Sequence, residues 1–592
     1  MLIAVTALSP VSYYSPQDQS RVCLSQAIVH GRLYNDRCLA SSFDRSSYGG
    51  HLYSDKAPGL SLLELPATAI VALPPAQRVP TLSLRTWLIR ITSSGIAFLV
   101  LAFLIGRLAE GLAPGYGGPA LVSFALGTLV APFAAVNFAE LPLAAFGFGA
   151  FLLAWARRPV LAGFLGGVGV LVEYQGALLL VVVGVYVALQ GLRPLSRYVA
   201  GAVPPALLLL GYDTLAFGRP WRTSYGYIAN VLASQQATGF FGVGVPHSFG
   251  LYSVFSSSGG LLVLSPVLVA AAWGLARIGP QYRVEAIVCT VVVVLLVLLD
   301  AGYFMPYGGI SPGPRFLIPC LPFLGLGLGP AFLWRPRLTT VLAALSIVPT
   351  VAMTLVWPAN HPLRETIWGE LARIPSDLGN ARFVHSLSSN VIVWARFSHT
   401  EGAVLVAAAA IAAFTLAVVG SGAWRKPNAR AVSTWGAVVV AGSLCLIAAA
   451  TASAVLKFPY GARSDGATPS FVTLVPSIVG TRTAASPGEE VDFTVYLNNP
   501  TSDTLTQVLL TLKLSSGLKL LGPPFYERGS GCVGTSTLVC NLDFLEARRS
   551  TLLRLGVQVT SAPGATETVQ ATVASEGLAS QHTAEYKIVV ES

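Results

Sequence analysis

The chain has 592 residues, of which 53% are hydrophobic and only 11% are charged. A typical soluble domain carries about 25% charged residues, so this composition excludes an ordinary soluble protein and indicates a membrane protein. The net charge is +10, but many of the Arg and Lys residues stand singly or in pairs between apolar segments, as the positive-inside rule predicts. No nucleic-acid partner is therefore expected.

The first apolar segment, MLIAVTALSP, is too short to cross a bilayer alone. It has no basic region and no cleavage motif, so it is interpreted as a short signal anchor or as the end of a helix that starts upstream. Apolar segments of about 17 to 25 residues then recur as far as Leu456, each long enough to cross a hydrocarbon core. Together they predict a polytopic α-helical membrane domain over residues 1–457 with about 13 spans. Besides the first segment, the expected helices are 58–75, 91–108, 116–136, 140–156, 159–191, 197–216, 260–277, 284–302, 314–333, 338–357, 402–422 and 432–455.

Basic residues near the segment ends predict which connections face the cytoplasm. The sequence WRKPNAR at 424–430 is expected inside, so the final helix carries the rest of the chain outward. The connections then expected outside are 11–57, 217–259, 303–313 and 358–401.

The side of the membrane expected for each connection can be assigned from the N-terminal end or from the C-terminal end of the chain. The two assignments differ by one span near Arg157 and Arg158. Either 159–191 is one tilted crossing, or its Gly-rich half, GFLGGVG, is a separate short or re-entrant segment. We predict the single crossing, because it gives an odd total of 13 spans and makes the two assignments agree.

Residues 458–592 have a different composition, rich in Thr, Ser, Val and Gly, with alternating apolar positions. Stretches such as EEVDFTVYLNN and STLLRLGVQVT predict about seven short strands separated by turns, and hence an all-β immunoglobulin-like sandwich outside the membrane. SPGEEVDFTVYLNNPTSD followed by GCVGTSTLVC resembles bacterial surface domains of the DUF11 type. That resemblance implies a spacer or adhesion module.

The cysteines fall into three groups. Cys289, Cys320 and Cys445 lie in apolar segments and are interpreted as buried thiols. The other four form two pairs, one in the first loop and one in the C-terminal domain, and both regions are expected outside, where disulfides form. No spacing of the cysteines indicates a structural zinc site. The candidate disulfide residues are Cys23, Cys38, Cys532 and Cys540.

The polar loop 11–57 concentrates charged residues between two apolar segments. Asp18 follows the first segment directly and Lys56 precedes the second, so both are expected at the same lipid–water boundary. A carboxylate there can act as a general base towards a hydroxyl, and a cation can neutralise a lipid-linked phosphate. The alternative is an ordinary solvated loop.

Ordered motifs connect this loop with later segments. Asp18-Gln19-Ser20-Arg21 is followed by the sequence YSDKAPG at 53–59 and by the Glu173-Tyr174 pair. GGISPGPRFLIPCLPFL at 308–324 comes later, and APFAAVNFAE at 131–140 ends in Glu140. This set, over about 18–330, resembles the membrane glycosyltransferases of the C superfold, in particular family 39-like bacterial relatives of protein O-mannosyltransferase and lipid A aminoarabinose transferase. Glu140 departs from the pattern, which has histidine at that position.

The resemblance implies roles for single residues. Asp18 would deprotonate the acceptor hydroxyl, and Asp55 would contact the acceptor, the donor sugar or a divalent cation; the metal requirement stays unknown. His51, Glu173 and Tyr174 are candidate contacts to the acceptor or the sugar. The residues implied to bind the donor phosphate are Arg21, Lys56 and Arg315.

Several of these residues have simpler explanations. Arg315 could be an interfacial arginine whose side chain reaches the surface, and His51 is as readily a loop histidine as a ligand. Glu140 could merely mark the end of a helix. Glu173 is expected within the membrane, where a charge costs at least about 2.5 kcal/mol, which favours a function or a buried partner.

The resemblance implies a multi-pass enzyme of the bacterial inner membrane whose active-site loop and C-terminal domain are extracytoplasmic. It would move a sugar from a polyprenyl-phosphate donor, held among membrane lipids, to a hydroxyl of a glycan, lipid or protein. One alternative is a lipid-sugar transporter or flippase, for which charges near mid-membrane would be expected. The other is a membrane-anchored surface scaffold, for which one anchoring helix would suffice.

Overall fold

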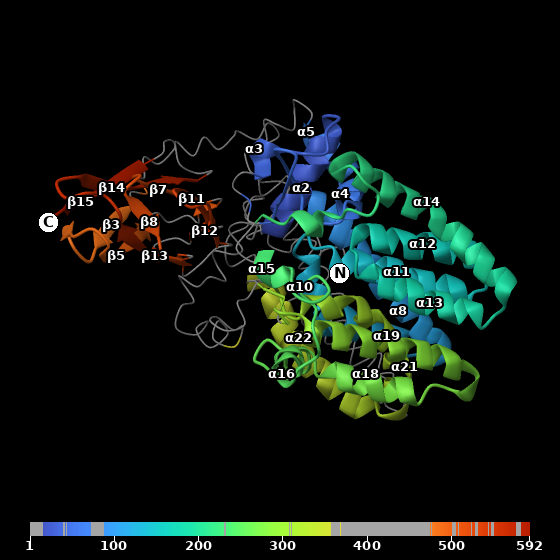
Figure 1. Cartoon of the computed structure of the whole chain (residues 1–592). Helices are drawn as coiled ribbons and strands as arrows, with labels where there is room; N and C mark the ends of the chain where they lie inside the picture. Colours follow the sequence, from blue (N-terminus) through green and yellow to red (C-terminus); the bar gives the residue numbers. More distant parts are fainter. Residues whose placement is uncertain are drawn as a thin grey trace, which may run out of the picture.

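The computed structural model of the chain comprises a helical part and a C-terminal β part (Figure 1). The first segment, the expected spans at 402–422 and 432–455, and Cys445 lie outside the residues that the structure describes. Those residues are 16–39, 42, 44–72, 88–229, 233–306, 308–309, 311–356, 368, 474, 476–499, 505–506, 508–522, 524–526, 531–542, 544–545, 550–575 and 582–591.

The helical part begins with the polar loop and continues through the apolar segments. The polar loop is itself structured, because a buried helix and a short hairpin occupy residues that the sequence indicated only as a connection. Its elements are α2 (Pro16–Val29), α3 (Asp36–Leu39), β1 (Ser46–Tyr48) and β2 (His51–Tyr53). The elements that follow, as far as the second half of the helical part, are α4 (Gly59–Leu63), α5 (Leu65–Ala72), η1 (Ile91–Gly95), α8 (Ile96–Leu112), α9 (Gly117–Gly127), α10 (Val130–Ala134), α11 (Glu140–Trp155), α12 (Pro159–Val172), α13 (Gly176–Ala188) and α14 (Leu192–Phe217).

The second half of the helical part begins with short elements over the expected external connection and ends in apolar helices. They are η2 (Ser224–Tyr227), α15 (Ala233–Gln236), α16 (Ser248–Phe255), α17 (Leu261–Leu264), α18 (Val267–Ala276), η3 (Pro280–Tyr282), α19 (Arg283–Gly302), η4 (Arg315–Cys320), α20 (Leu321–Gly325), α21 (Leu328–Trp334) and α22 (Pro336–Val356).

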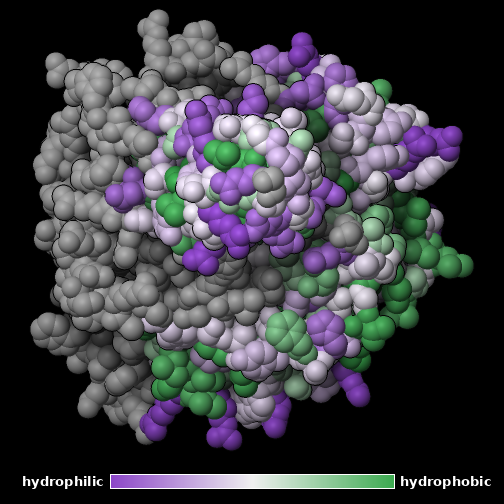
Figure 2. Space-filling view, turned by 60° about the vertical axis from the view of Figure 1, so that its left-hand side comes forward, coloured by the Kyte–Doolittle hydropathy of each residue, from purple (hydrophilic) through white to green (hydrophobic). Residues whose placement is uncertain are grey.

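Several described helices are suited to a membrane. Three are long and apolar enough to cross one: Leu88–Leu112, Leu192–Phe217 and Pro280–Gly302. A fourth is obtained if the bent pair Arg315–Gly325 and Leu328–Trp334, with 52° between its helices, counts as one span. Figure 2 shows hydrophobic residues gathered over the helical part, whereas hydrophilic residues cover much of the β part that lies in front. The total of about 13 spans stays a prediction.

The single crossing expected over 159–191 is wrong. The structure has two helices there, α12 and α13, separated by a break at Glu173, whose backbone is extended. A Cβ atom on Gly176 would lie 2.7 Å from the Gly169 carbonyl carbon, and one on Gly166 would lie 2.7 Å from Leu180 Cδ1, so the helices form an antiparallel hairpin. The polar residues at the break line a cavity. The apolar sequence on both sides of the break gave no sign of it.

Helices α12 and α14 approach each other closely through glycines. A Cβ atom on Gly163 would lie 1.8 Å from the Tyr198 carbonyl oxygen, and one on Gly201 would lie 2.0 Å from the Val160 carbonyl oxygen. Small residues at such a contact let helix backbones pack by van der Waals attraction within the membrane. The Gly-rich segment of α12 therefore serves helix packing.

Replacing Gly201 with alanine is expected to destabilise the protein by about 1–3 kcal/mol, because the added methyl group has no space beside Val160. Gly211 lies on the same helix, α14, and a Cβ atom there would meet nothing within 4 Å. Gly211→Ala should therefore leave the unfolding temperature in detergent unchanged or raise it. Equal unfolding temperatures for the two variants would contradict the close packing.

The β part contains the strands β3 (Ser477–Gly480), β4 (Ala484–Ala485), β5 (Glu490–Asn498), β6 (Leu505–Thr506), β7 (Leu509–Leu514), β8 (Leu518–Leu520), β9 (Phe525–Tyr526), β10 (Gly531–Val533), β11 (Thr537–Asn541), β12 (Phe544–Leu545), β13 (Ser550–Val559), β14 (Thr566–Ala574) and β15 (His582–Val590).

These strands form two main sheets that enclose one apolar core. The six-stranded sheet has the order β10-β11-β7-β14-β15-β4, and the other has the order β3-β5-β13-β8 with β9 paired to β13. Inward residues alternate along the strands, as in β5 with Val491, Phe493 and Val495. An immunoglobulin-like topology and the DUF11 assignment stay predictions.

Candidate active site

A cavity of about 510 Å³ lies among the ends of several helices and the connections between them. Its size is within the range of small-molecule sites, roughly 300–1,000 Å³. One group of lining residues is charged: Arg21, Asp44, Asp55, Lys56, Glu140, Glu173 and Arg315. Another group is apolar: Ala177, Leu178, Phe240, Phe241, Val243, Leu295, Leu299, Phe304, Met305 and Phe316. The remaining residues are Gln17, Tyr174, Gln175, Thr223, Tyr225, Gln236 and Tyr303.

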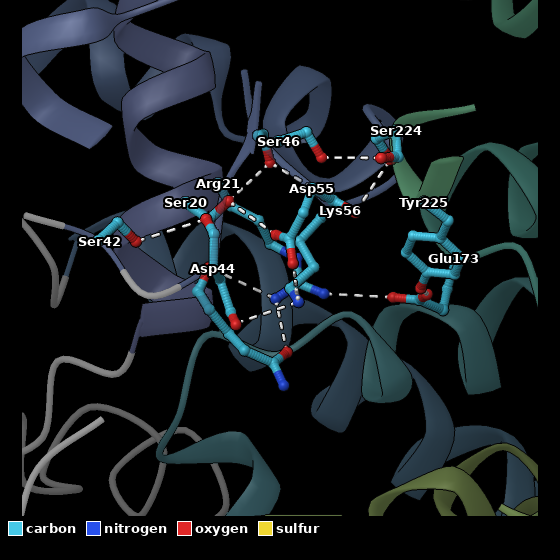
Figure 3. Close-up of polar contacts among 12 residues, drawn as sticks. Ser20, Arg21, Ser42, Asp44, Ser46, Asp55, Lys56, Glu173, Ser224 and Tyr225 are labelled. Carbon is cyan, nitrogen blue, oxygen red and sulfur yellow. Dashed lines mark hydrogen bonds and ion pairs between the residues drawn. The ribbon is translucent and has the colours of Figure 1, made fainter. Parts of the chain in front are cut away.

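Lys56 lies between two carboxylates of the polar loop (Figure 3). Its Nζ is 3.0 Å from Asp44 Oδ2 and 3.0 Å from Asp55 Oδ2. The β1–β2 hairpin turns at Gly49 and Gly50, whose φ angles are 57° and 84°, and so returns the chain beside itself. Asp44 precedes this hairpin and Lys56 follows it, which brings residues distant by a dozen positions into contact.

Burial controls the charge of this cluster. It raises the pKa of the Asp55 carboxyl to about 6, although the neighbouring Lys56 ammonium opposes that shift. Burial alone would lower the pKa of Lys56, but Asp44 and Asp55 raise it above its ordinary value. Lys56 is therefore a buried cation with two anionic partners, and Asp55 is the partner that takes up a proton more readily than an exposed aspartate.

Hydroxyl groups hold the Asp55 segment in place. Ser20 Oγ donates to Asp55 Oδ1 at 3.2 Å and lies 2.8 Å from Ser54 Oγ. Ser224 Oγ donates to the Asp55 carbonyl oxygen at 2.9 Å, and Ser46 Oγ donates to the Ser224 carbonyl oxygen at 2.8 Å. Helix α2 thereby holds the Asp55 carboxylate, while η2 holds the Asp55 backbone and is itself held by the hairpin.

Arg21 and Glu173 form a buried ion pair across the site. Arg21 Nη2 is 3.2 Å from Glu173 Oε2, and the two side chains are 1% and 8% exposed. Arg21 Nη1 also donates to Gln17 Oε1 at 2.9 Å, while the Tyr225 hydroxyl donates to Glu173 Oε1 at 3.1 Å. The break between α12 and α13 thus supplies a carboxylate to α2.

A third ion pair joins Arg315 to Glu140. Arg315 Nε lies 3.5 Å from Glu140 Oε1, and the guanidinium group lies over the Phe316 ring, 4.8 Å from its centroid. Glu140 is the first residue of α11, whereas Arg315 begins η4. Each of the three cavity cations therefore has at least one carboxylate partner.

Asp18, the predicted base, lies on the buried side of α2. It is 1% exposed, and its Oδ1 accepts a hydrogen bond from the Asn137 backbone N–H at 3.0 Å. Asn137 also donates through Nδ2 to Glu64 Oε1 at 2.6 Å. Asp18 is not among the cavity-lining residues, but its neighbour Gln17 is, as is Arg21 one helical turn further on.

The structure brings most of the predicted residues together. Arg21, Asp55, Lys56, Glu173, Tyr174 and Arg315 all line the cavity. His51 lies elsewhere, because its Nδ1 contacts Asp36 Oδ2 at 2.9 Å and its ring stacks on Tyr34 with 3.9 Å between centroids.

Sequence reasoning missed some cavity residues. Asp44 was one of several loop carboxylates, and only its place before the Tyr48-Gly49-Gly50 turn could have paired it with Lys56. Tyr225 lies in a connection without a recognisable motif. Glu140 was noted in the sequence only as a possible helix end, and its pairing with Arg315 was not predicted.

The structure contains disulfide bonds in both regions expected outside the membrane. Cys23 of α2 is joined to Cys38 of α3 with 5.7 Å between Cα atoms. Cys532 is joined to Cys540 across the β10–β11 pair. The first bond anchors α3 to the helix that carries Arg21, while Cys289 and Cys320 are free and buried.

No metal cluster is apparent in the described part of the chain, where no three His, Cys, Asp or Glu side chains are placed to hold an ion. A divalent cation therefore stays a prediction of the resemblance.

Searches of protein-family models and of curated proteins find no match. Among solved structures, the chain is similar to ArnT from Cupriavidus metallidurans bound to undecaprenyl phosphate, with 15% identity, a TM-score of 0.42, and coverage of 76% of this chain and 75% of ArnT. It is also similar to the arabinosyltransferase EmbB from Mycobacterium smegmatis, with 13% identity, a TM-score of 0.34, and coverage of 100% and 64%.

A further similarity covers only 20% of the chain. It involves the N-terminal domain of the Streptococcus gordonii adhesin Sgo0707, with 8% identity, a TM-score of 0.17 and coverage of 33% of that chain. The chain thus spans about a third of this adhesin structure and 64% of EmbB. All these TM-scores are below 0.5, and none of the similarities fixes the activity of this chain.

Proposed function

We propose that the protein is a membrane glycosyltransferase that moves a sugar from a polyprenyl-phosphate donor to an extracytoplasmic acceptor hydroxyl. The observation that carries this proposal is a cavity with two kinds of wall. Its lining combines the cations Lys56, Arg315 and Arg21 with apolar residues such as Leu295 and Leu299 of α19, which are compatible with a lipid chain. A lipid-linked sugar phosphate has the same division between an anionic head and an apolar chain.

The phosphate is assigned to Lys56 and Arg315, in keeping with the motifs at 53–59 and 308–324 that resemble those of the C-superfold enzymes. Lys56 has two anionic partners, so a donor phosphodiester would displace one of them, and the displaced carboxylate would need a proton to avoid being left as an unpaired buried anion. Protonation of Asp55, whose pKa is about 6, would favour that exchange. The leaving phosphate is then neutralised by fixed cations.

The transfer itself needs a base on the side of the sugar opposite to the phosphate. The acceptor oxygen attacks the anomeric carbon, the bond from that carbon to the phosphate oxygen breaks, and its electron pair leaves with the polyprenyl phosphate. The acceptor proton passes to a carboxylate. Asp55 is bound to the phosphate-binding Lys56 and so lies on the leaving-group side. Asp18, held by the Asn137 backbone N–H, is the carboxylate we assign as base; it is buried behind the lining residues, so the acceptor hydroxyl has to enter beside Gln17 to reach it.

Transfer of radiolabelled sugar by the purified full-length protein in lipid nanodiscs tests the proposal. The donors would be undecaprenyl-phosphate hexoses and pentoses, and the acceptors bacterial envelope fractions. Lys56→Met is expected to lower the transfer rate by about 10²–10³-fold, because the leaving phosphate loses a fixed cation. Lys513→Met removes an exposed lysine of β7 and should transfer at the wild-type rate.

Two results would overturn this assignment. Undiminished transfer by Lys56→Met would remove Lys56 from the reaction. Absence of transfer by wild type from every donor, although the donors bind, would favour a lipid-sugar transporter.

A further inference from the structure

Gln175 occupies a distinctive place in the cavity wall. It is the last residue of the break between α12 and α13, directly before Gly176 begins α13. The preceding Glu173 and Tyr174 line the cavity, and so do the apolar residues Ala177 and Leu178 that follow. Gln175 therefore stands in the chain between a charged and an apolar group of cavity-lining residues.

The side-chain amide of Gln175 has no internal partner. Neither Oε1 nor Nε2 makes a hydrogen bond with any residue that the structure describes, and both atoms are shielded from solvent. Gln17, by contrast, uses its Oε1 to accept from Arg21 at 2.9 Å. A shielded amide with both its donor and its acceptor unused is rare in native proteins and needs an explanation, such as a ligand that supplies both bonds.

The charges around the cavity restrict what that ligand can be. The lining cations are Arg21, Lys56 and Arg315, and the lining carboxylates are Asp44, Asp55, Glu140 and Glu173. Every one of these cations is already paired to a carboxylate. A donor phosphate brings a further negative charge, so a second acidic group on the sugar would meet repulsion without a cation to neutralise it.

We propose that Gln175, whose covered amide turns into the cavity when the donor binds, selects the transferred sugar by binding two neighbouring hydroxyl groups of a neutral sugar, accepting from one through Oε1 and donating to the other through Nε2. The inference rests on the proposed function and adds the class of sugar to it. A carboxamide offers one acceptor and donors at fixed spacing, and adjacent sugar hydroxyls can both donate and accept. A sugar that lacks one hydroxyl would leave the amide unpaired, which is the strongest basis for discrimination between similar ligands.

Equilibrium binding separates this inference from the proposed function. The probes are undecaprenyl phosphate alone, undecaprenyl-phosphate glucose and mannose, their deoxy analogues, and undecaprenyl-phosphate glucuronic acid. Wild type is expected to bind at least one neutral sugar donor more tightly than the bare lipid phosphate. Gln175→Leu, which keeps the size and removes the hydrogen bonds, should lose roughly 10-fold in affinity for that donor. Its affinity for undecaprenyl phosphate should stay unchanged.

The matched control is Gln190→Ala, beyond the other end of α13, where the Gln190 amide donates to the Ala154 carbonyl oxygen at 3.2 Å. It should bind every probe as wild type does. The loss of affinity caused by Gln175→Leu should be smaller for a deoxy analogue that lacks one of the bound hydroxyl groups than for the parent sugar. This result would support the paired contact. Equal loss on parent and all deoxy analogues, no loss at all, or tighter binding of the glucuronic acid donor than of neutral donors would overturn the inference. Failure of wild type to bind even undecaprenyl phosphate would instead overturn the proposed function.

Discussion

Replacing Asp18 with asparagine is expected to lower the rate of sugar transfer by about 10²–10⁴-fold, the contribution typical of a general base. Asparagine has nearly the same shape and can still accept the hydrogen bond from the Asn137 backbone N–H, so α2 should keep its place. What it cannot do is take a proton from the acceptor hydroxyl. The expected signature in kinetics is therefore a lower kcat with little change in donor affinity.

Asp55→Asn is the informative comparison, because it places the same substitution on the carboxylate beside Lys56. It should change donor affinity more than kcat, since it removes one anion that competes with the phosphate. Asp36→Asn, at the exposed contact with His51, should leave both constants unchanged. If Asp55→Asn abolishes kcat while Asp18→Asn transfers normally, the base is Asp55 and the phosphate-side assignment of that residue is wrong.

Much of the cavity could be predicted because its charged residues stand in unusual places. An apolar chain with 11% charged residues seldom places Glu173 inside an apolar run or Arg315 at the start of one, and both positions line the cavity. Lys56 was predicted from the YSDKAPG motif at 53–59. Residues without such a contrast stayed hidden, since Asp44 and Tyr225 belong to polar connections in which any residue could face solvent.

Hydropathy located the apolar segments and did not reveal how they break. The sequence from Pro159 to Gln190 is apolar enough for one long crossing, yet it folds back at Glu173 because that carboxylate pairs with Arg21 of α2. The partner lies 152 positions away in the sequence, so no local pattern carries this information. His51 lies away from the cavity for a local reason, because Asp36 of the same loop contacts it at the surface.

Replacing Arg21 with methionine is expected to be the most destabilising single change in the site, by about 3–5 kcal/mol, the usual cost of leaving a buried charge unpaired. Burial alone would lower the pKa of Arg21, but nearby carboxylates raise it above its ordinary value. These carboxylates are Glu173, Glu140, Glu64 and Asp18. Methionine fills the space but removes the cation that these carboxylates share. Their mutual repulsion is then no longer compensated.

Removing the other partner should cost less, which distinguishes a shared cation from a simple pair. In Glu173→Gln, Arg21 keeps its bond to Gln17 and the field of the remaining carboxylates, so a loss of about 1–2 kcal/mol is expected. The double variant should be more stable than the sum of the single losses predicts, because neither charge is then left alone. Arg193→Met, at an exposed position in the first turn of α14, should change stability by less than about 0.5 kcal/mol. Unfolding in mixed micelles of increasing denaturing detergent measures all four variants. Equal losses for Arg21→Met and Glu173→Gln would mean that the pair is isolated and that the other carboxylates do not depend on Arg21.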